Sequence, residues 1–143
     1  METTDHKKII WLASYPKSGN TWFRAFLANL LHPGDKPADI NELEGGPIAS
    51  SRALFDEATG LSSSDLTPAE IENLRPFVYR YIARNSTEII FHKIHDAYTL
   101  TSEGVALVPA EATRCAIYFV RNPLDVAVFF CTPCQHGFSF DGR

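Results

Sequence analysis

The chain has 143 residues, of which 45% are hydrophobic and 21% are charged, and its formal net charge is −4. This length and composition are typical of one globular domain that buries its own core without help from a disulfide or a metal. The negative net charge argues against a broad nucleic-acid-binding surface. Any anion site must therefore be local, built from a few cations and main-chain N–H groups.

The first 32 residues predict a strand, a tight turn and a helix. KIIWLA at 8–13 combines β-branched and aromatic side chains, which is typical of a buried strand. After the turn, apolar residues recur at helical spacing until Pro33-Gly34 ends the pattern. Strand, turn and helix in this order open a parallel α/β unit. The apolar residues of the helix are Trp22, Phe23, Phe26, Leu27, Leu30 and Leu31.

Residues 33–66 are rich in proline, glycine, serine and acidic residues. This composition predicts a long surface loop with a short helix at SRALFDEA. Thr67-Pro68-Ala69-Glu70 then predicts a helix start with a capping box. Pro76 is expected to break or kink this helix, so that PFVYRYIARN continues as a second helix.

EIIFHKIH at 88–95 and TRCAIYFV at 113–120 predict two more buried strands, and RNPLDVAVFF predicts a loop that enters a helix at Pro123. The three strands end near residues 14, 94 and 120, each directly before polar or basic residues. Ligands bind at the carboxyl ends of parallel strands, so these polar residues are expected to converge. The predicted fold class is α/β with a parallel sheet.

The first turn, SYPKSGNT, has the features of an anion-binding loop. A helix N-terminus exposes unpaired N–H groups and a partial positive charge. Gly19 lets the chain approach an anion closely, while Ser18 and Thr21 offer hydroxyl groups. The alternative is that the turn binds no ligand, and that Lys17 is a solvated residue in an ordinary connection between a strand and a helix.

The turn differs from the Walker pattern G-x-x-x-x-G-K-[ST] of nucleoside-triphosphate sites. Gly19 and Thr21 match its sixth and eighth places, but Asn20 occupies the lysine place and the lysine lies at position 17. Arg121, rather than a metal-holding aspartate, follows the later strand. The pattern favours a phosphate-bearing donor that is bound by protein cations without a metal.

YPKSGNTW closely resembles the 5′-phosphosulfate-binding loop, commonly written YPKSGTTW, of the sulfotransferases that use 3′-phosphoadenosine 5′-phosphosulfate (PAPS). IYFVRNPLDVAV at 117–128 resembles the 3′-phosphate motif of that family, and FHKIHDAY at 91–98 resembles its K-x-H segment. The resemblance implies a P-loop-like three-layer fold, with residues 1–128 as the N-terminal portion of a sulfotransferase domain.

The resemblance also implies a reaction, the transfer of a sulfuryl group from PAPS to the hydroxyl or amine of a small alcohol, phenol or amine. His95 would take the acceptor's proton. Lys17 and Lys93 would stabilise charge on the leaving 5′-phosphate oxygen. No metal is implied. The cofactor contacts carried over are Lys17, Ser18, Gly19, Asn20, Thr21, Trp22 beside the adenine, and Arg121 at the 3′-phosphate.

The pattern changes at Phe129, where the family usually has a serine that helps to hold the 3′-phosphate. Residues 129–143 lack helical periodicity, which predicts an atypical tail, as in a truncated or frameshifted product. A C-terminally truncated domain would leave apolar faces uncovered and bind adenosine 3′,5′-bisphosphate (PAP) weakly. Two alternatives remain open, a P-loop nucleotide kinase and a catalytically silent PAPS-binding or interaction fragment.

The remaining expectations concern cysteines, location and partners. Cys115, Cys131 and Cys134 have no regular spacing, which favours reduced thiols and a cytoplasmic location. Cys131-x-x-Cys134-x-His136 has no evident fourth ligand, so zinc is not expected. The apolar runs are far shorter than a membrane span or a secretory signal. Neither a membrane nor a nucleic acid is expected as a partner, and the sequence is silent on oligomeric state.

Overall fold

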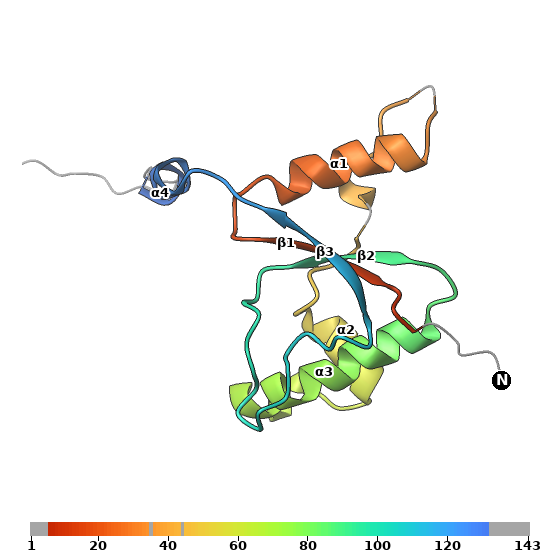
Figure 1. Ribbon diagram of the computed structural model, residues 1–143, viewed down its shortest axis with the longest axis vertical. Helices are drawn as coiled ribbons and strands as arrows, with labels where there is room; N and C mark the ends of the chain where they lie inside the picture. Colours follow the sequence, from red (N-terminus) through yellow and green to blue (C-terminus); the bar gives the residue numbers. More distant parts are fainter. Residues whose placement is uncertain (1–5, 35, 44, 132–143) are drawn as a thin grey trace, which may run out of the picture.

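The computed structural model describes residues 6–34, 36–43 and 45–131 of the chain (Figure 1). Three strands and four α-helices make up this part, with short 3₁₀ turns at Ile40–Glu42 and Ser63–Asp65. The elements in chain order are β1 Ile9–Ser14, α1 Asn20–Leu31, α2 Arg52–Thr59, α3 Pro68–Asn85, β2 Ile90–Ile94, β3 Thr113–Phe119 and α4 Pro123–Cys131.

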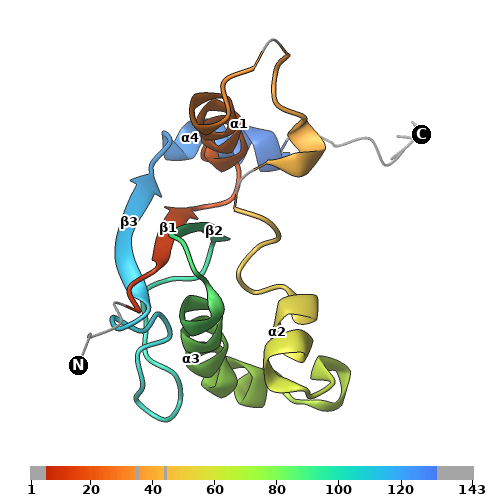
Figure 2. The same cartoon turned by 90° about the vertical axis from the view of Figure 1, so that its right-hand side faces the viewer.

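The strands form one parallel sheet in the order β2-β1-β3. Ala13 in β1 lies opposite Ile94 in β2 and Tyr118 in β3, so the carboxyl ends of all three strands lie at one edge. α1 lies on one side of the sheet, whereas α2 and α3 lie on the other (Figures 1 and 2). The α/β class and the predicted convergence of the strand ends are therefore confirmed.

The hydrophobic core fills the space between the sheet and α3. Trp11 lies at its centre, with its ring 5.0 Å from the Tyr79 ring in an edge-on contact, and its Nε1–H donates to Thr113 Oγ1 at 2.9 Å. Burial and the nearby charge of Asp96 raise the pKa of Tyr79 to about 12, so this core hydroxyl stays protonated. The other buried core residues are Ile9, Ala49, Phe55, Val78, Ala83, Ile94 and Ala112.

The capping box at the start of α3 is present, but the predicted break at Pro76 is wrong. Thr67 Oγ1 accepts from the Glu70 N–H at 3.3 Å, and Glu70 Oε2 accepts from the Thr67 N–H at 2.8 Å. One helix runs through Pro76, which is fully buried in the interior beside Val78 and Tyr79. Because this stretch packs on the core, tertiary contacts offset the lost hydrogen bond of the proline.

The prediction that residues 113–120 form a buried strand is correct for the strand and wrong for its burial. β3 pairs with β1 alone in the described sheet, so it lies at an edge. Its residues Arg114, Cys115, Ala116 and Tyr118 are exposed. An apolar run indicates a strand, but it does not indicate the place of that strand in the sheet.

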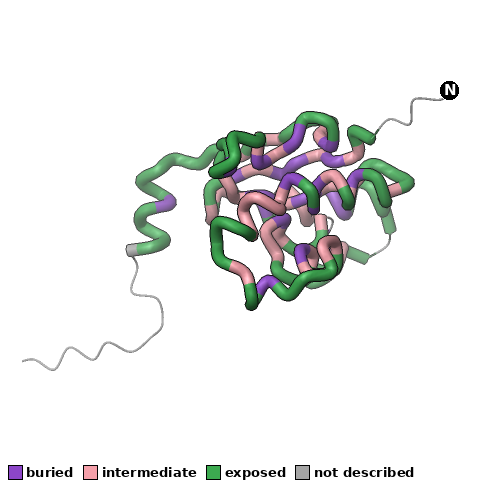
Figure 3. Tube along the Cα trace, turned by 90° about the horizontal axis from the view of Figure 1, so that it is seen from below, coloured by how far each residue is buried: buried purple, intermediate pink, exposed green. Residues whose placement is uncertain are grey.

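α4 continues through Phe129 to Cys131, past the position at which the sequence pattern changes. It stands away from the body of the molecule, with Val126 as its buried residue (Figure 3). Cys134, His136 and the side chain of Cys131, which the sequence grouped together, lie outside the described residues. Within the described part of the chain, every helix is too short or too polar to span a membrane.

Candidate anion-binding site

The turn between β1 and α1 reverses the chain within a few residues. Its Ser18 N–H donates to Tyr15 O at 3.2 Å. Lys17 has φ 67° and Gly19 has φ 102°, both in the left-handed region. A side chain at position 19 would meet no atom within 4 Å. Backbone geometry rather than crowding therefore requires the glycine, and the space before it is open to a ligand.

The N-terminus of α1 opens onto this turn without a side-chain cap. Gly19 occupies the cap position, and Asn20, Thr21 and Trp22 begin the helix. The first N–H groups of a helix have no acceptor within the helix, and its dipole adds partial positive charge. None of these residues carries a carboxylate. This end of α1 can therefore donate several hydrogen bonds to an anion.

The Asn20 side chain points into the fold. It is buried, and its Nδ2 donates to Leu12 O at 2.8 Å and to Ser14 Oγ at 3.2 Å. The amide therefore ties the start of α1 to the end of β1. A ligand contact by Asn20 remains a prediction for its main-chain N–H, because its side-chain donors already have acceptors in the protein.

The same serine positions His95, which follows β2. His95 Nδ1 lies 2.6 Å from Ser14 O and 3.3 Å from Ser14 Oγ. A carbonyl oxygen can only accept, so Nδ1 carries the hydrogen and Nε2 is the basic nitrogen of the neutral ring. Asn20, Ser14 and His95 thus form one hydrogen-bonded chain that fixes the histidine beside the turn. Ser14 is a residue of the site that the sequence did not predict, although its position directly before the turn is a signal for it.

Lys93 shares a positive environment with the turn. Burial lowers the pKa of Lys93, and the charges of Arg24 and Lys17 lower it further. Arg24 is held in place by donating to Leu43 O at 3.0 Å and Gly46 O at 3.1 Å. Three cations near one another favour an anion between them.

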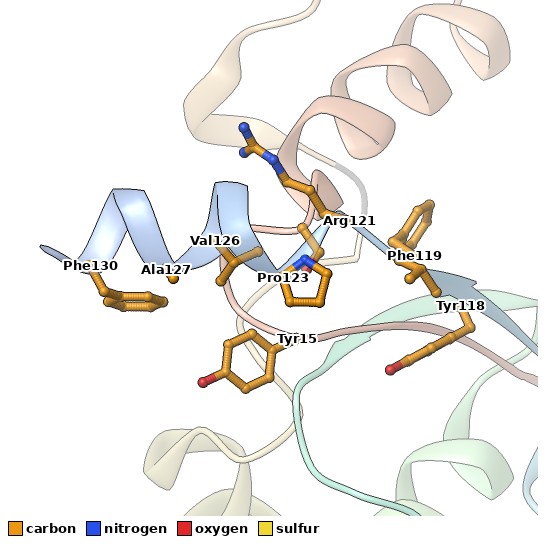
Figure 4. A pocket seen from close by; sticks show the side chains of 10 residues that line it. Tyr15, Tyr118, Phe119, Arg121, Pro123, Val126, Ala127 and Phe130 are labelled. Carbon is orange, nitrogen blue, oxygen red and sulfur yellow. The ribbon is translucent and has the colours of Figure 1, made fainter. Parts of the chain in front are cut away.

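Arg121 reaches the turn from the end of β3. Its Nη1–H donates to Lys17 O at 3.2 Å, and its Nε lies 3.8 Å from Asp125 Oδ2. Figure 4 shows the guanidinium pointing away from the rings of Tyr15 and Phe130. The residues assigned to the 5′-phosphate and 3′-phosphate motifs thus meet in space, although they are 104 positions apart.

Two cavities flank the turn and have the side chains of Tyr15 and Tyr118 in common. One, of about 440 Å³, is lined by Ser18, Arg121 and residues of α4 (Figure 4). The other, of about 610 Å³, contains Ser14 and His95. A ligand that spans both cavities would touch the turn and the histidine together. The walls of the second cavity also include Trp11, Ala13, Ile94, Asp96, Ala97, Tyr98, Val108 and Ala116.

The structure also shows a contact that the sequence did not signal. The ring of Phe129 lies over Lys17, with Nζ 4.3 Å from the ring centroid. Trp22, assigned to the adenine by resemblance, is exposed and stacks on Phe26 at 6.2 Å. Lys17 therefore has an aromatic neighbour from α4, and the adenine contact of Trp22 remains a prediction.

No group of three histidine, cysteine, aspartate or glutamate side chains in the described ranges is arranged to hold a metal ion. Comparison with protein-family models, curated proteins and solved structures found no match for the chain. The sulfotransferase resemblance therefore depends on the three motifs and on the geometry of the residues that they contain.

Proposed function

We propose that this chain forms the donor-binding part of a sulfotransferase that moves a sulfuryl group from PAPS to the hydroxyl or amine of a small molecule. One structural observation gives this proposal its main support. The turn that bears Lys17 contacts Arg121 directly and is joined to His95 through Ser14, all at the carboxyl edge of a parallel sheet. The proposal includes a P-loop-like three-layer fold.

The chemistry follows from the positions of these groups. The first N–H groups of α1, Ser18 and Lys17 would hold the 5′-phosphate, and Arg121 would hold the 3′-phosphate. His95 Nε2 would accept the acceptor's proton as the acceptor atom bonds to sulfur. The bond between sulfur and the 5′-phosphate oxygen breaks in the same reaction, and its electron pair leaves with PAP. Lys17 and Lys93 would stabilise the charge on that oxygen.

The two alternatives differ from this proposal in measurable ways. A P-loop kinase needs a lysine where this chain has the buried Asn20, and it would prefer ATP with Mg²⁺. A silent binding fragment would bind PAP without transferring sulfate. A cytoplasmic location and a reaction without a metal are part of the proposal as well.

The test is transfer of labelled sulfate from PAPS to a panel of phenols, alcohols and amines. His95→Gln should reduce the rate by about 10²–10⁴ because it removes the general base. Lys17→Met should reduce it by about 10²–10³. Lys36→Met and His32→Gln, at exposed positions, should leave the rate unchanged.

Two results would contradict the proposal. One is transfer that survives both Lys17→Met and His95→Gln. The other is an absence of both transfer and PAP binding together with Mg²⁺-dependent ATP binding, which would favour the kinase. PAP binding without transfer to any acceptor would instead support the silent fragment.

A further inference from the structure

Phe129 and Arg121 both bring α4 against the Lys17 turn. Arg121 donates to Lys17 O at 3.2 Å, and the Phe129 ring lies 4.3 Å from Lys17 Nζ. Asp125, which lies 3.8 Å from Arg121, is four residues before Phe129 on α4. Residues four apart share one face of a helix. One face of α4 is therefore directed at the turn.

The rest of α4 has little cover. Leu124, Val128 and Phe130 are exposed, and Val126 is buried. Figure 3 shows the helix standing away from the body of the molecule. The contact between Phe129 and Lys17 is therefore one of those that position the outer turns of α4.

A ring over an ammonium group competes with an anion for the same charge. The attraction between Lys17 and Phe129 is electrostatic, and it is strongest when water and counter-ions are kept from the ammonium. A phosphate at the N-terminus of α1 would attract the same ammonium group far more strongly than a benzene ring does. The ring occupies one side of the ammonium group, so a phosphate must compete with the ring for the position of the Lys17 side chain.

We infer that Phe129 competes with a nucleotide phosphate for Lys17 and lowers the affinity of the turn, so that ligand binding draws the Lys17 side chain away from the ring. The inference depends on the proposed binding role of Lys17. It assigns to Phe129 a function as an affinity-determining residue, at the position where the sequence departs from the motif that it resembles.

Calorimetry with PAP tests the inference through Phe129→Leu, which keeps an apolar side chain and removes the ring. This variant should bind PAP about two- to fivefold more tightly than the wild type, which corresponds to about 0.4–1 kcal/mol. Phe77→Leu is the matched control, since Phe77 is 50% exposed on α3 and Phe129 is 40% exposed on α4. The control should bind PAP as the wild type does.

A double-mutant cycle on Lys17 and Phe129 is the second test of the inference. In a Lys17→Met background, Phe129→Leu should no longer change the affinity for PAP, because the charge that the ring contacts is gone. In spectra of the wild type, ring current should shift the Lys17 ε-CH₂ signal upfield, and the shift should be lost on adding PAP and in Phe129→Leu.

The outcomes separate the inference from the proposed function. If the wild type binds PAP and Phe129→Leu binds it equally or more weakly, the inference is wrong and the proposed function stands. An unshifted Lys17 ε-CH₂ signal in the wild type also overturns the inference. If neither protein binds PAP, the proposed function fails and the inference fails with it.

Discussion

His92 shows how one buried residue links the fold to pH. Its ring is buried and stacks on Trp11 with the centroids 6.0 Å apart, and its Nδ1 has no hydrogen-bond partner in the described structure. Burial lowers the pKa of His92 below its usual value of 6.5. The folded protein therefore holds this ring neutral at pH values where the unfolded chain binds a proton.

This difference predicts a loss of stability on acidification. Below about pH 6.5 the unfolded state takes up a proton at His92 and the folded state does not, so the free energy of unfolding falls until the folded-state pKa is reached. The slope from this one group is at most about 1.4 kcal/mol per pH unit. Urea unfolding between pH 7.5 and 5 measures it.

His92→Leu should flatten that dependence, because its side chain cannot titrate in either state. His6→Gln, at an exposed position, should keep the wild-type slope. Equal slopes in the wild type and in His92→Leu would show that His92 does not supply the pH dependence.

At the scale of elements, two ion pairs connect α3 to the loops around the sheet. Arg75 contacts Asp96, next to His95, and Arg80 contacts Glu111 before β3, each with an N–O distance of 2.6 Å. The side chains of the first pair are 22% and 23% exposed, whereas those of the second are 30% and 58% exposed. The two pairs therefore have the same length and different access to water.

We expect double-mutant cycles to separate the two pairs. Alanine substitutions at Arg75 and Asp96 should give a coupling energy of about 1.5–3 kcal/mol, since a charged hydrogen bond is stronger when shielded from water. The Arg80–Glu111 cycle should give about 0.2–1 kcal/mol. A coupling energy for Arg75–Asp96 no larger than that of Arg80–Glu111 would contradict this account.

Local signals in the sequence predicted several elements well, because the physics that forms them is local. The Thr67 capping box lies within one helical turn, and the strand–turn–helix around Lys17 lies within one continuous segment. The course of α3 through Pro76 and the exposure of β3 could not be predicted in this way. Both depend on which elements pack together, and a single apolar pattern does not contain that information.

At the scale of the whole molecule, the sequence predicted one part of the candidate site and did not predict another. Parallel strand ends predicted that His95 and Arg121 would approach the turn, since topology alone brings such ends together. The links that complete the site are between distant parts of the chain: the Ser14 bond to His95, and the ring of Phe129 over Lys17. No periodicity or turn signal encodes such contacts, so they became visible only in the folded structure.

The central claim is that main-chain N–H groups at the start of α1, together with Lys17, bind the phosphate end of a nucleotide. Titration of ¹⁵N-labelled protein with PAP, followed in amide proton–nitrogen spectra, tests it most directly. We expect the largest shifts at the amides of residues 18–22, a smaller response at Arg121, and a higher PAP concentration needed for both in Lys17→Met. Binding that shifts amides elsewhere and leaves residues 18–22 unchanged would contradict the claim.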